Sequence, residues 1–577
     1  MEVLNVDAKK LSLRNTDTKK VESYLLDLLR GTSSNPAMTA YAVSYVIVKS
    51  SQIDASDLSS IDAFISSCCI GKDIELFLRD KLRDSWEYVS KARSVFDSEM
   101  FKAFLLFDDI TYGREFADTP HSITSLSLRL LDIKDSDYVA DYCTGRLSFI
   151  CNSYLNAPDA RYLGTEINSD LACIALMRAE LLGDNITVRN EDTLACEFSK
   201  TKYDKVFSDY PWGMKITGDM GGAALRYINK YISSPRNTLS NEWIMNTVII
   251  NSLKDNGKGV AITPAGPLFR GGAERDIRKH FAENGFIEAI IELPSNMYET
   301  TSISTLLIVF SFNNKSIRFI NASEICQKGR RFNVFSNENI DEIVKLYKND
   351  SQFSKYVGID EIAQNDYNLQ PSRYFEEKAP VKNGIPFGDV IKSITRGAQL
   401  TAAKLDELIS DKPTDYQYLT LADIQDGEIK DDLSYISGID DNLQKYCLKT
   451  NDLLISKNGS PIKVAIADAE IDHSILVNGN LYIIQLDKDK IDPYYLKAFL
   501  DSESGAASIK QICYGAVVPN IPVEALKKMV IPLPPLDQQR KIAAEYTKAL
   551  DGIKKLRSQL KSAEEKLKNI YNEHIES

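Results

Sequence analysis

Short apolar runs alternate with amphipathic segments over residues 138–312, and this alternation restricts the fold more than any other feature of the sequence. The runs have the length of β-strands, and the segments between them can form helices. Alternating strands and helices favour an α/β fold with a doubly wound, largely parallel sheet, whose binding crevice lies at the carboxyl ends of the strands. The runs are Tyr138–Ala140, Tyr162–Gly164, Ile186–Val188, Lys205–Phe207, Gly259–Ile262, Ile287–Ile291 and Thr305–Phe310.

Polar residues follow the first three predicted strands. Asp141 and Gly145 follow the first strand, and Glu166 ends the second. An acid placed about 20 residues on is typical of folds that bind a dinucleotide or an adenosyl cofactor, because its carboxylate accepts hydrogen bonds from ribose hydroxyls. Asp192 follows the third strand, where it can accept from a cofactor adenine amine, although a solvated loop acid explains it equally well. A single glycine after a strand also fits an ordinary strand-to-helix turn.

The tetrapeptide Asp209-Tyr210-Pro211-Trp212 follows the fourth predicted strand. An acid, a proline and an aromatic ring at a strand end can hold a flipped-out nucleobase: the acid accepts a hydrogen bond from an exocyclic amine, and the ring stacks on the base. The tetrapeptide therefore predicts an adenine-methylating site. The alternative is a strand-ending turn with a buried tryptophan.

The pattern along the chain divides it into five segments. Residues 1–110 are predicted to form an N-terminal helical domain, and residues 111–312 form the domain of the parallel sheet. Residues 313–383 are predicted to be a polar linker or extension. Residues 384–535 predict a separate mixed domain of short strands and turns, and residues 536–577 predict one long helix.

The long helix has apolar residues at alternating steps of four and three, which is the pattern of a coiled coil. A single amphipathic helix that packs on its own domain is the alternative, because Gly552 and two alanines weaken the apolar seam. The positions are Ile542, Tyr546, Ala549, Ile553, Leu556, Leu560, Ala563, Leu567 and Ile570.

Composition excludes several classes of function. The net charge of -12 argues against a general nucleic-acid coat, since such binding depends on Lys and Arg, but it leaves room for specific DNA binding on one basic face. No apolar stretch approaches the roughly 18 to 20 residues of a membrane span, so we expect a cytoplasmic protein without membrane contact. The nine cysteines lack metal-ligand spacing, so we expect them to be reduced and no metal to be bound.

Several stretches make residues 111–312 resemble the modification subunit of type I restriction-modification systems, a family of adenine-specific DNA methyltransferases. The resemblance implies a class I, Rossmann-like methyltransferase fold that binds S-adenosylmethionine and passes its methyl group to an adenine amine. The matching stretches are Phe116–Pro120, Gly164–Asn168, Asn190–Leu194, Pro267–Glu274 and Leu293–Ser295, besides Asp209–Trp212.

On the family pattern Asp209 accepts from the adenine amine, the Tyr210 carbonyl is a second acceptor, and Trp212 is the stacking platform. Pro211 keeps its usual place, whereas Tyr210 stands where a first proline is expected. This exchange leaves the carbonyl in place but removes rigidity and adds bulk.

The resemblance also implies residues that hold the cofactor. Thr119 and Pro120 end a segment that packs against it, beside the residues that follow the first three strands. Leu147 and Ser148 stand where the family has small, glycine-like residues. We expect Leu147 to project toward the methionine part of S-adenosylmethionine and to weaken its binding.

Residues 384–575 resemble a different protein of the same systems, the specificity subunit. Such subunits usually carry two target-recognition domains, whereas this chain carries one, so pairing of two chains through residues 536–577 would supply the symmetry of a two-part site. Lys457, Asn458 and Lys463 are candidates for contacts to phosphates or base edges, with a solvated loop as the alternative. The matching stretches are Leu421–Gly427, Asn451–Gly459, Asp492–Leu496 and Ile531–Gln539.

Together these features predict a sequence-specific DNA adenine-N6 methyltransferase of a type I-like restriction-modification or defence system, with modification and specificity in one chain that acts on double-stranded DNA. The alternative is a catalytically degenerate subunit of the same fold that supplies DNA recognition or scaffolding to an active methyltransferase partner. A small-molecule or protein methyltransferase would leave the C-terminal half unexplained. The sequence has no phosphate-binding Gly-x-x-x-x-Gly-Lys-Ser/Thr loop, so any cleavage or translocation is expected to belong to a separate restriction subunit.

Overall fold

The chain folds into two units, residues 1–375 and 376–577. The computed structural model describes residues 18–31, 33, 35–53, 58–107, 118–195, 201–218, 220–375, 384–459, 461–467, 474–513 and 520–575.

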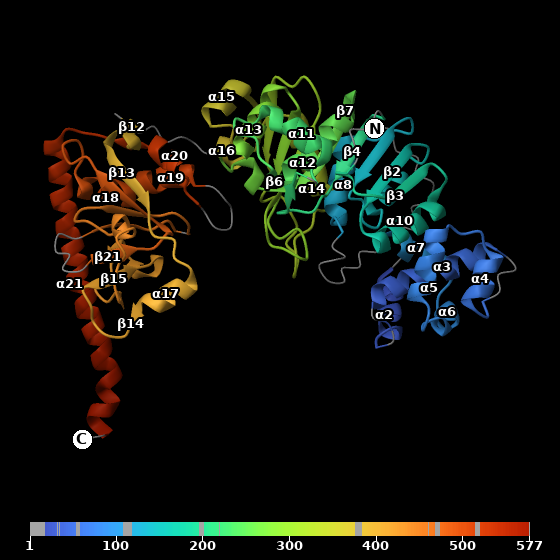
Figure 1. Cartoon of the computed structure of the whole chain (residues 1–577), viewed down its shortest axis with the longest axis horizontal. Helices are drawn as coiled ribbons and strands as arrows, with labels where there is room; N and C mark the ends of the chain where they lie inside the picture. Colours follow the sequence, from blue (N-terminus) through green and yellow to red (C-terminus); the bar gives the residue numbers. More distant parts are fainter. Residues whose placement is uncertain are drawn as a thin grey trace. The chain divides into compact units, whose positions relative to one another are not determined.

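A nine-stranded sheet with the order β11-β10-β8-β9-β7-β4-β1-β2-β3 forms the centre of the first unit (Figure 1). The neighbours from β7 through β4, β1 and β2 to β3 pair in parallel, whereas β9 runs antiparallel to both β7 and β8. The predicted doubly wound, largely parallel sheet is confirmed. The strands are β1 (Tyr138–Tyr142), β2 (Arg161–Glu166), β3 (Ile186–Asn190), β4 (Tyr203–Ser208), β7 (Leu253–Pro264), β8 (Ile287–Glu292), β9 (Thr305–Phe310), β10 (Ser316–Asn321) and β11 (Ser354–Gly358).

Helices cover both faces of this sheet because successive strand residues point to opposite sides. Val139 and Phe207 lie in the core beneath α8, α9, α10 and α14, whereas Ala140 and Val206 lie in the core beneath α11, α12 and α13. The helices are α8 (His121–Leu131), α9 (Ser148–Tyr154), α10 (Ser169–Leu182), α11 (Gly222–Ile228), α12 (Asn241–Ser252), α13 (Ala273–Glu283), α14 (Asn337–Lys348), α15 (Ile359–Gln364) and α16 (Ser372–Phe375). A two-stranded ribbon of β5 (Lys215–Thr217) and β6 (Thr238–Ser240) and two short 3-10 turns, η2 (Asn229–Tyr231) and η3 (Gly266–Leu268), complete this part.

Most of residues 313–383, predicted as a linker or extension, extends the sheet and does not form a linker. β10 pairs in parallel with β8, and β11 pairs antiparallel with β10, so both strands belong to the sheet. Ile317 and Phe319 are buried in one core and Ile320 in the other. The polar residues at 313–315 form only the short turn before β10. Their polarity favours the prediction of a linker, although apolar residues of a strand follow directly.

The N-terminal helices share a core with the sheet domain. Ile174 and Met177 of α10 lie in the same apolar cluster as the helices that precede the sheet, and Figure 1 shows α3, α5 and α7 beside α10. The predicted helical character of this region is therefore observed, but the region packs directly on α10. The helices are α2 (Thr18–Leu28), α3 (Pro36–Gln52), α4 (Ile61–Ser67), α5 (Lys72–Lys81), α6 (Glu87–Arg93) and α7 (Ser98–Phe107).

The second unit contains two four-stranded sheets, β13-β22-β19-β20 and β14-β18-β15-β21. β12 and β23 pair with each other, as do β16 and β17. The strands are β12 (Gly384–Pro386), β13 (Ile391–Arg396), β14 (Ile409–Ser410), β15 (Tyr416–Leu419), β16 (Ile424–Gln425), β17 (Glu428–Ile429), β18 (Ser434–Ile436), β19 (Leu453–Ser456), β20 (Val464–Ile466), β21 (Ser474–Val477), β22 (Leu481–Leu486) and β23 (Val530–Pro532). The helices are α17 (Ala402–Leu408), α18 (Pro493–Asp501), α19 (Glu503–Ile512) and α20 (Val523–Lys528), with 3-10 turns η4 (Phe387–Val390), η5 (Leu421–Asp423) and η6 (Gln444–Tyr446).

One long helix, α21 (Leu536–Ile575), ends the second unit. Its first turns pack on the unit: Gln539 is buried, and the Tyr546 hydroxyl donates to Asp501 of α18. From residue 551 to 568 the side chains are exposed, and Figure 1 shows the red helix continuing beyond the other elements of its unit. A coiled coil through this segment stays a prediction. No helix within the described ranges has the length and apolarity needed to cross a membrane.

Candidate active site

Four acids lie at the carboxyl ends of adjacent parallel strands. Asp141 is the fourth residue of β1, Glu166 ends β2, Asp192 follows β3 and Asp209 follows β4. Burial raises the pKa of Asp141 well above its usual value, and the negative charges of Glu166 and Asp209 raise it further. The sheet therefore brings these predicted site residues together at one edge, and their mutual repulsion favours a positively charged ligand there.

Asp209 is held by two hydroxyl groups on the same carboxylate oxygen. Thr119 donates to Asp209 Oδ2 at 2.7 Å, and the Tyr298 hydroxyl donates to the same oxygen at 2.8 Å. Burial raises the pKa of Asp209 to about 6, while the two hydrogen bonds act in the opposite direction. Within the described residues Oδ1 accepts no hydrogen bond. One oxygen is thus fixed by the protein, and the other is left to accept from a ligand.

The rest of the tetrapeptide is divided between the core and the site. The Tyr210 side chain is buried, and its hydroxyl donates to Asn246 Oδ1 at 2.9 Å. The added bulk of this residue therefore lies in the core beside α12. Pro211 is exposed, and its carbonyl accepts from the Asn241 side-chain amide at 2.7 Å, which fixes the turn.

The Trp212 ring is half-buried and restrained from two sides. Its indole N–H donates to the carbonyl of Ile262 at 3.2 Å, and its ring meets the edge of Tyr298 with centroids 5.0 Å apart at 80°. Tyr298 thus touches both the predicted amine acceptor and the predicted stacking ring. An aromatic platform beside a carboxylate can position a planar base with an exocyclic amine.

The turn after β1 corrects the expectation for Leu147. Cys143, Gly145 and Leu147 all have positive φ angles, of 61°, 55° and 72°, so Leu147 adopts a backbone conformation that usually favours glycine. Its side chain is fully buried in a hydrophobic core and packs over Gly164 of β2, where a Cβ would lie 3.0 Å from Leu147 Cδ1. Leu147 is a core residue, and its side chain does not project into a ligand site.

Ser148 and Asp118 belong to a partly buried polar network behind the same turn. Ser148 and Arg146 both donate to Asp118 Oδ2, at 2.6 Å and 2.8 Å. Arg146 also donates to the hydroxyl of Tyr41 on α3, and Arg178 of α10 donates to the Arg146 carbonyl at 2.7 Å. The turn is therefore braced by the N-terminal helices and by the segment that carries Thr119.

Glu166 is oriented by two backbone N–H groups. Gly145 donates to Oε2 at 2.9 Å, and Asn168 donates to Oε1 at 2.8 Å. A carboxylate can accept about four hydrogen bonds, so Glu166 keeps capacity for two hydroxyls of a ligand. Asp192 accepts from the backbone of Leu194 at 2.9 Å, and Pro120 immediately precedes α8. Among the described residues no group of His, Cys, Asp or Glu has the arrangement of a metal site.

Tyr298 is the site residue that sequence reasoning missed. It lies in the loop between β8 and β9. Leu293, five residues earlier, begins one of the stretches that resemble the modification subunit. The direction of β8 is the feature that could have pointed to Tyr298. β8 runs parallel to β4, so the loop that follows β8 leaves the same edge of the sheet as Asp209. Only the fold shows that this loop reaches Asp209.

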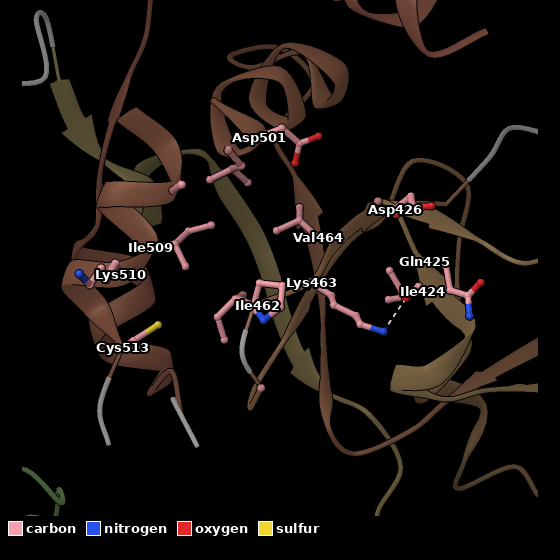
Figure 2. Close-up of a pocket in the computed structure, with 15 residues that line it drawn as sticks. Ile424, Gln425, Asp426, Ile462, Lys463, Val464, Asp501, Ile509, Lys510 and Cys513 are labelled. Carbon is pink, nitrogen blue, oxygen red and sulfur yellow. Dashed lines mark hydrogen bonds between the residues drawn. The ribbon is translucent and has the colours of Figure 1, made fainter. Parts of the chain in front are cut away.

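The predicted nucleic-acid contacts lie in the second unit. Lys463 donates to the carbonyls of Leu421 and Ile424 at 2.9 and 2.7 Å and lines a cavity of about 810 Å³ (Figure 2). Two of its three N–H groups therefore bind its own domain. Lys457 lies near Arg396, and burial together with that positive charge lowers its pKa. Asn458 forms an isolated bridge with Asn520.

Comparisons with known proteins divide the chain close to the boundary between its two units. Residues 112–382 match the family described as N-6 DNA Methylase, and residues 386–563 match the family described as Type I restriction modification DNA specificity domain. The resemblances to a modification subunit and to a specificity subunit are confirmed, and both lie in one chain.

Individual relatives cover only parts of the chain. The type I restriction enzyme MjaVIII methylase subunit of Methanocaldococcus jannaschii is 28% identical over 307 residues, which are 48% of this chain and 52% of the relative. The putative MjaX specificity subunit of the same organism is 33% identical over 162 residues, 27% of this chain and 36% of the relative. The chain thus spans about half the length of the methylase relatives that it matches.

Among solved structures, the DrdV–DNA complex determined by electron cryomicroscopy has a similar fold. Its TM-score is 0.52 at 10% sequence identity, and the match covers 94% of this chain and 70% of the other. At this identity the match concerns the fold alone.

Proposed function

We propose that this chain, in which an N-6 DNA methylase region is joined to a type I restriction-modification specificity region, methylates the N6 amine of adenine in a defined sequence of double-stranded DNA. The Asp209 arrangement carries the proposal: Thr119 and Tyr298 hold Oδ2, and Trp212 lies against Tyr298. A carboxylate that is held through one oxygen beside an aromatic ring is the arrangement that catalysis on a base requires. This arrangement therefore favours catalysis over the degenerate scaffold, which was the alternative from the sequence.

The two acceptors act on the amine of a flipped-out adenine. Asp209 Oδ1 accepts one N–H, the Tyr210 carbonyl accepts the other, and the Trp212 ring supports the base. Both hydrogen bonds increase electron density on the amine nitrogen, which makes it a better nucleophile. The nitrogen that gains a methyl group must lose one proton, and Asp209, whose pKa is about 6, is a base of suitable strength to accept it near neutral pH.

S-adenosylmethionine, when bound, supplies the methyl group from a positively charged sulfonium. The acids at the strand ends suit this charge. Glu166 would accept from the ribose hydroxyls, Asp192 from the adenine amine of the cofactor, and Asp141 and Gly145 would face its methionine part, with Thr119 and Pro120 alongside. Because the Leu147 side chain is buried in the core, it does not oppose a ligand at this turn.

The second unit supplies the choice of DNA sequence in this proposal. Residues 384–535 form the target-recognition domain, and two chains pair through residues 536–577 so that a two-part site is read. A separate restriction subunit would supply nuclease or translocase activity, and the reaction would take place in the cytoplasm. The specificity match over residues 386–563 supports this division of labour.

Methylation-sensitive sequencing tests the proposal. Genomic DNA from cells that express the chain should contain N6-methyladenine at one recurring sequence, and DNA from cells that express Asp209→Ala should not. The Asp209→Ala chain should still bind DNA, since it loses one acceptor and no DNA-facing charge. Absence of new methyladenine with the natural chain, or equal methylation by Asp209→Ala, would overturn the proposal.

A further inference from the structure

A short basic loop lies between β10 and α14. Lys328, Arg330 and Arg331 are all exposed, and none of them forms an ion pair with a carboxylate in the described part of the chain. Three exposed cations within four residues are unusual in a chain with a net charge of -12. Such a concentration of positive charge is a site for a polyanion.

Hydrogen bonds tie this loop to the segment that carries Tyr298. Asn296 donates from its side chain to the Arg331 carbonyl at 2.9 Å, and its own carbonyl accepts from the Asn333 backbone at 2.7 Å. The Asn333 side chain donates to the Ser295 carbonyl at 2.9 Å. Gln327 and Val334 close the base of the loop as an antiparallel bridge. The loop is therefore built into the same structure that positions Asp209.

A glycine shapes the loop. A Cβ at Gly329 would lie 2.0 Å from the Phe332 carbonyl oxygen, so only glycine allows the turn between Lys328 and Arg330. The three cations are thus presented on a defined turn.

The topology places the basic loop at the edge of the sheet that carries the active site. β8 and β10 are parallel to each other and to β4, so the loops that follow these strands leave the same edge. β10 lies four positions from β4 in the sheet, which corresponds to about 19 Å at roughly 4.8 Å per strand. A DNA major groove is about 12 Å wide, so the separation between β10 and β4 is only somewhat larger than one groove. When a base of the duplex enters the site, phosphates near that base therefore lie over the neighbouring loops.

We infer that Lys328, Arg330 and Arg331 bind backbone phosphates of the duplex that delivers the adenine. This inference rests on the proposed function for its ligand. Phosphate contacts fix the register of a duplex without reading its sequence. The loop would therefore place any target next to Asp209, whichever sequence the second unit selects.

The test measures how DNA affinity depends on salt. Fluorescence anisotropy with a labelled duplex of mixed sequence compares the full chain with the triple variant Lys328→Ala, Arg330→Ala, Arg331→Ala. Each lost phosphate contact reduces the slope of log affinity against log salt by about 0.9, so three contacts reduce it by about 2.7. The charge-retaining variant Lys328→Arg, Arg330→Lys, Arg331→Lys should keep most of the natural slope.

A charge-matched control separates the loop from a general loss of cations. Lys134, Lys202 and Lys315 are exposed and precede β1, β4 and β10, so they lie at the opposite edge of the sheet. Changing these three to alanine removes the same charge and should leave the slope unchanged. Equal slopes for the natural chain and the loop variant would overturn the inference, and this is the result expected if the loop binds an acidic protein and not DNA. Equal reductions of the slope in both triple variants would also overturn it.

The outcome can be separated from that of the proposed function. A natural chain that methylates DNA, with a loop variant of unchanged slope, would reject the loop and keep the enzyme. A natural chain that never methylates DNA, with a slope that falls only in the loop variant, would keep the loop and reject the enzyme.

Discussion

Asp209 is the residue on which the chemistry depends, and its protonation predicts a pH profile. Burial raises its pKa to about 6, and only the ionised carboxylate is both a strong acceptor and a base. The methylation rate should therefore fall as the pH drops through about 6 and should be constant above it until other groups titrate. Single-turnover rates between pH 5 and pH 8 measure this limb; a rate independent of pH across that range would contradict the assignment.

Asp209→Asn is the matched variant for the same limb. The amide oxygen can still accept from adenine while the amide N–H₂ donates to the hydroxyls of Thr119 and Tyr298, which then act as acceptors. We expect a reduced rate that no longer falls near pH 6, whereas Asp209→Ala should be inactive at every pH. A limb that persists near pH 6 in Asp209→Asn would belong to another group.

Tyr298 is predicted to be a positioning residue that acts through Asp209. Tyr298→Phe keeps the ring against Trp212 but removes a hydrogen bond that lowers the Asp209 pKa. The acid limb of the rate profile should therefore move to higher pH: activity falls several-fold near pH 6 and recovers above pH 8. Tyr210→Phe, which loses core hydrogen bonds of the hydroxyl such as that to Asn246, is the control and should leave the limb in place. A uniform loss at all pH values in Tyr298→Phe would indicate a merely structural role.

At the residue scale, the sequence identifies residues whose role follows from their position at a strand end. It does not identify roles that depend on whether a side chain points into the core or into the site. Asp209, Glu166 and Asp141 could be named because their strands could be named. The burial of Tyr210 and Leu147 could not, because a strand-end pattern does not show which side of the backbone faces the core. Leu147 was misread for this reason: its positive φ is glycine-like, yet its side chain packs over Gly164.

At the scale of elements, the sheet continues beyond the last strand predicted from the sequence, and β10 shows why the prediction stopped too early. Arg318 in β10 is buried; it donates to the Ser354 hydroxyl at 2.8 Å and to the Asn349 carbonyl at 3.0 Å, and it stacks on the Tyr356 ring. A buried arginine between apolar residues makes the run look polar and hides the strand. Its partners lie about 30 residues away and cannot be read from local pattern.

Arg318→Ala should therefore destabilise the first unit. The change removes the donor to the buried Ser354 hydroxyl and to the Asn349 carbonyl, the ion pair with Asp350 and the stack on Tyr356. Together these losses should cost roughly 2 kcal/mol or more. Lys315→Ala, an exposed change three residues earlier, should cost less than about 0.5 kcal/mol. Urea unfolding followed by tryptophan fluorescence compares the two, and similar midpoints would show that Arg318 does not hold these strands together.

At the scale of the whole molecule, the sequence shows the joining of a modification region to a specificity region because each carries its own motifs. It does not show which turns of α21 belong to the unit and which are available to a partner. In the structure Tyr546 contacts Asp501, and Arg557 forms an ion pair with Asp426 at 3.1 Å, so one side of the helix stays on its unit to residue 557. Leu556, Leu560 and Leu567 are nevertheless 66%, 60% and 70% exposed. Large apolar side chains at such exposure on a helix with heptad spacing favour pairing with a second helix.

Dimerisation through this segment is the last prediction. Leu556→Asp with Leu560→Asp places two charges on the seam of a paired helix, where burial of each leucine would otherwise contribute about 2 kcal/mol. Sedimentation equilibrium should show a dimer for the natural chain and a monomer for this variant. Ser558→Asp with Ser562→Asp has the same spacing and the same added charge away from the seam, and it should remain dimeric. Because the seam is separate from Asp209 in sequence and unit, the monomer should keep S-adenosylmethionine binding while its affinity for a two-part DNA target falls. A leucine variant that stays dimeric would place the interface elsewhere, and a monomer with unchanged DNA affinity would show that one recognition domain is enough.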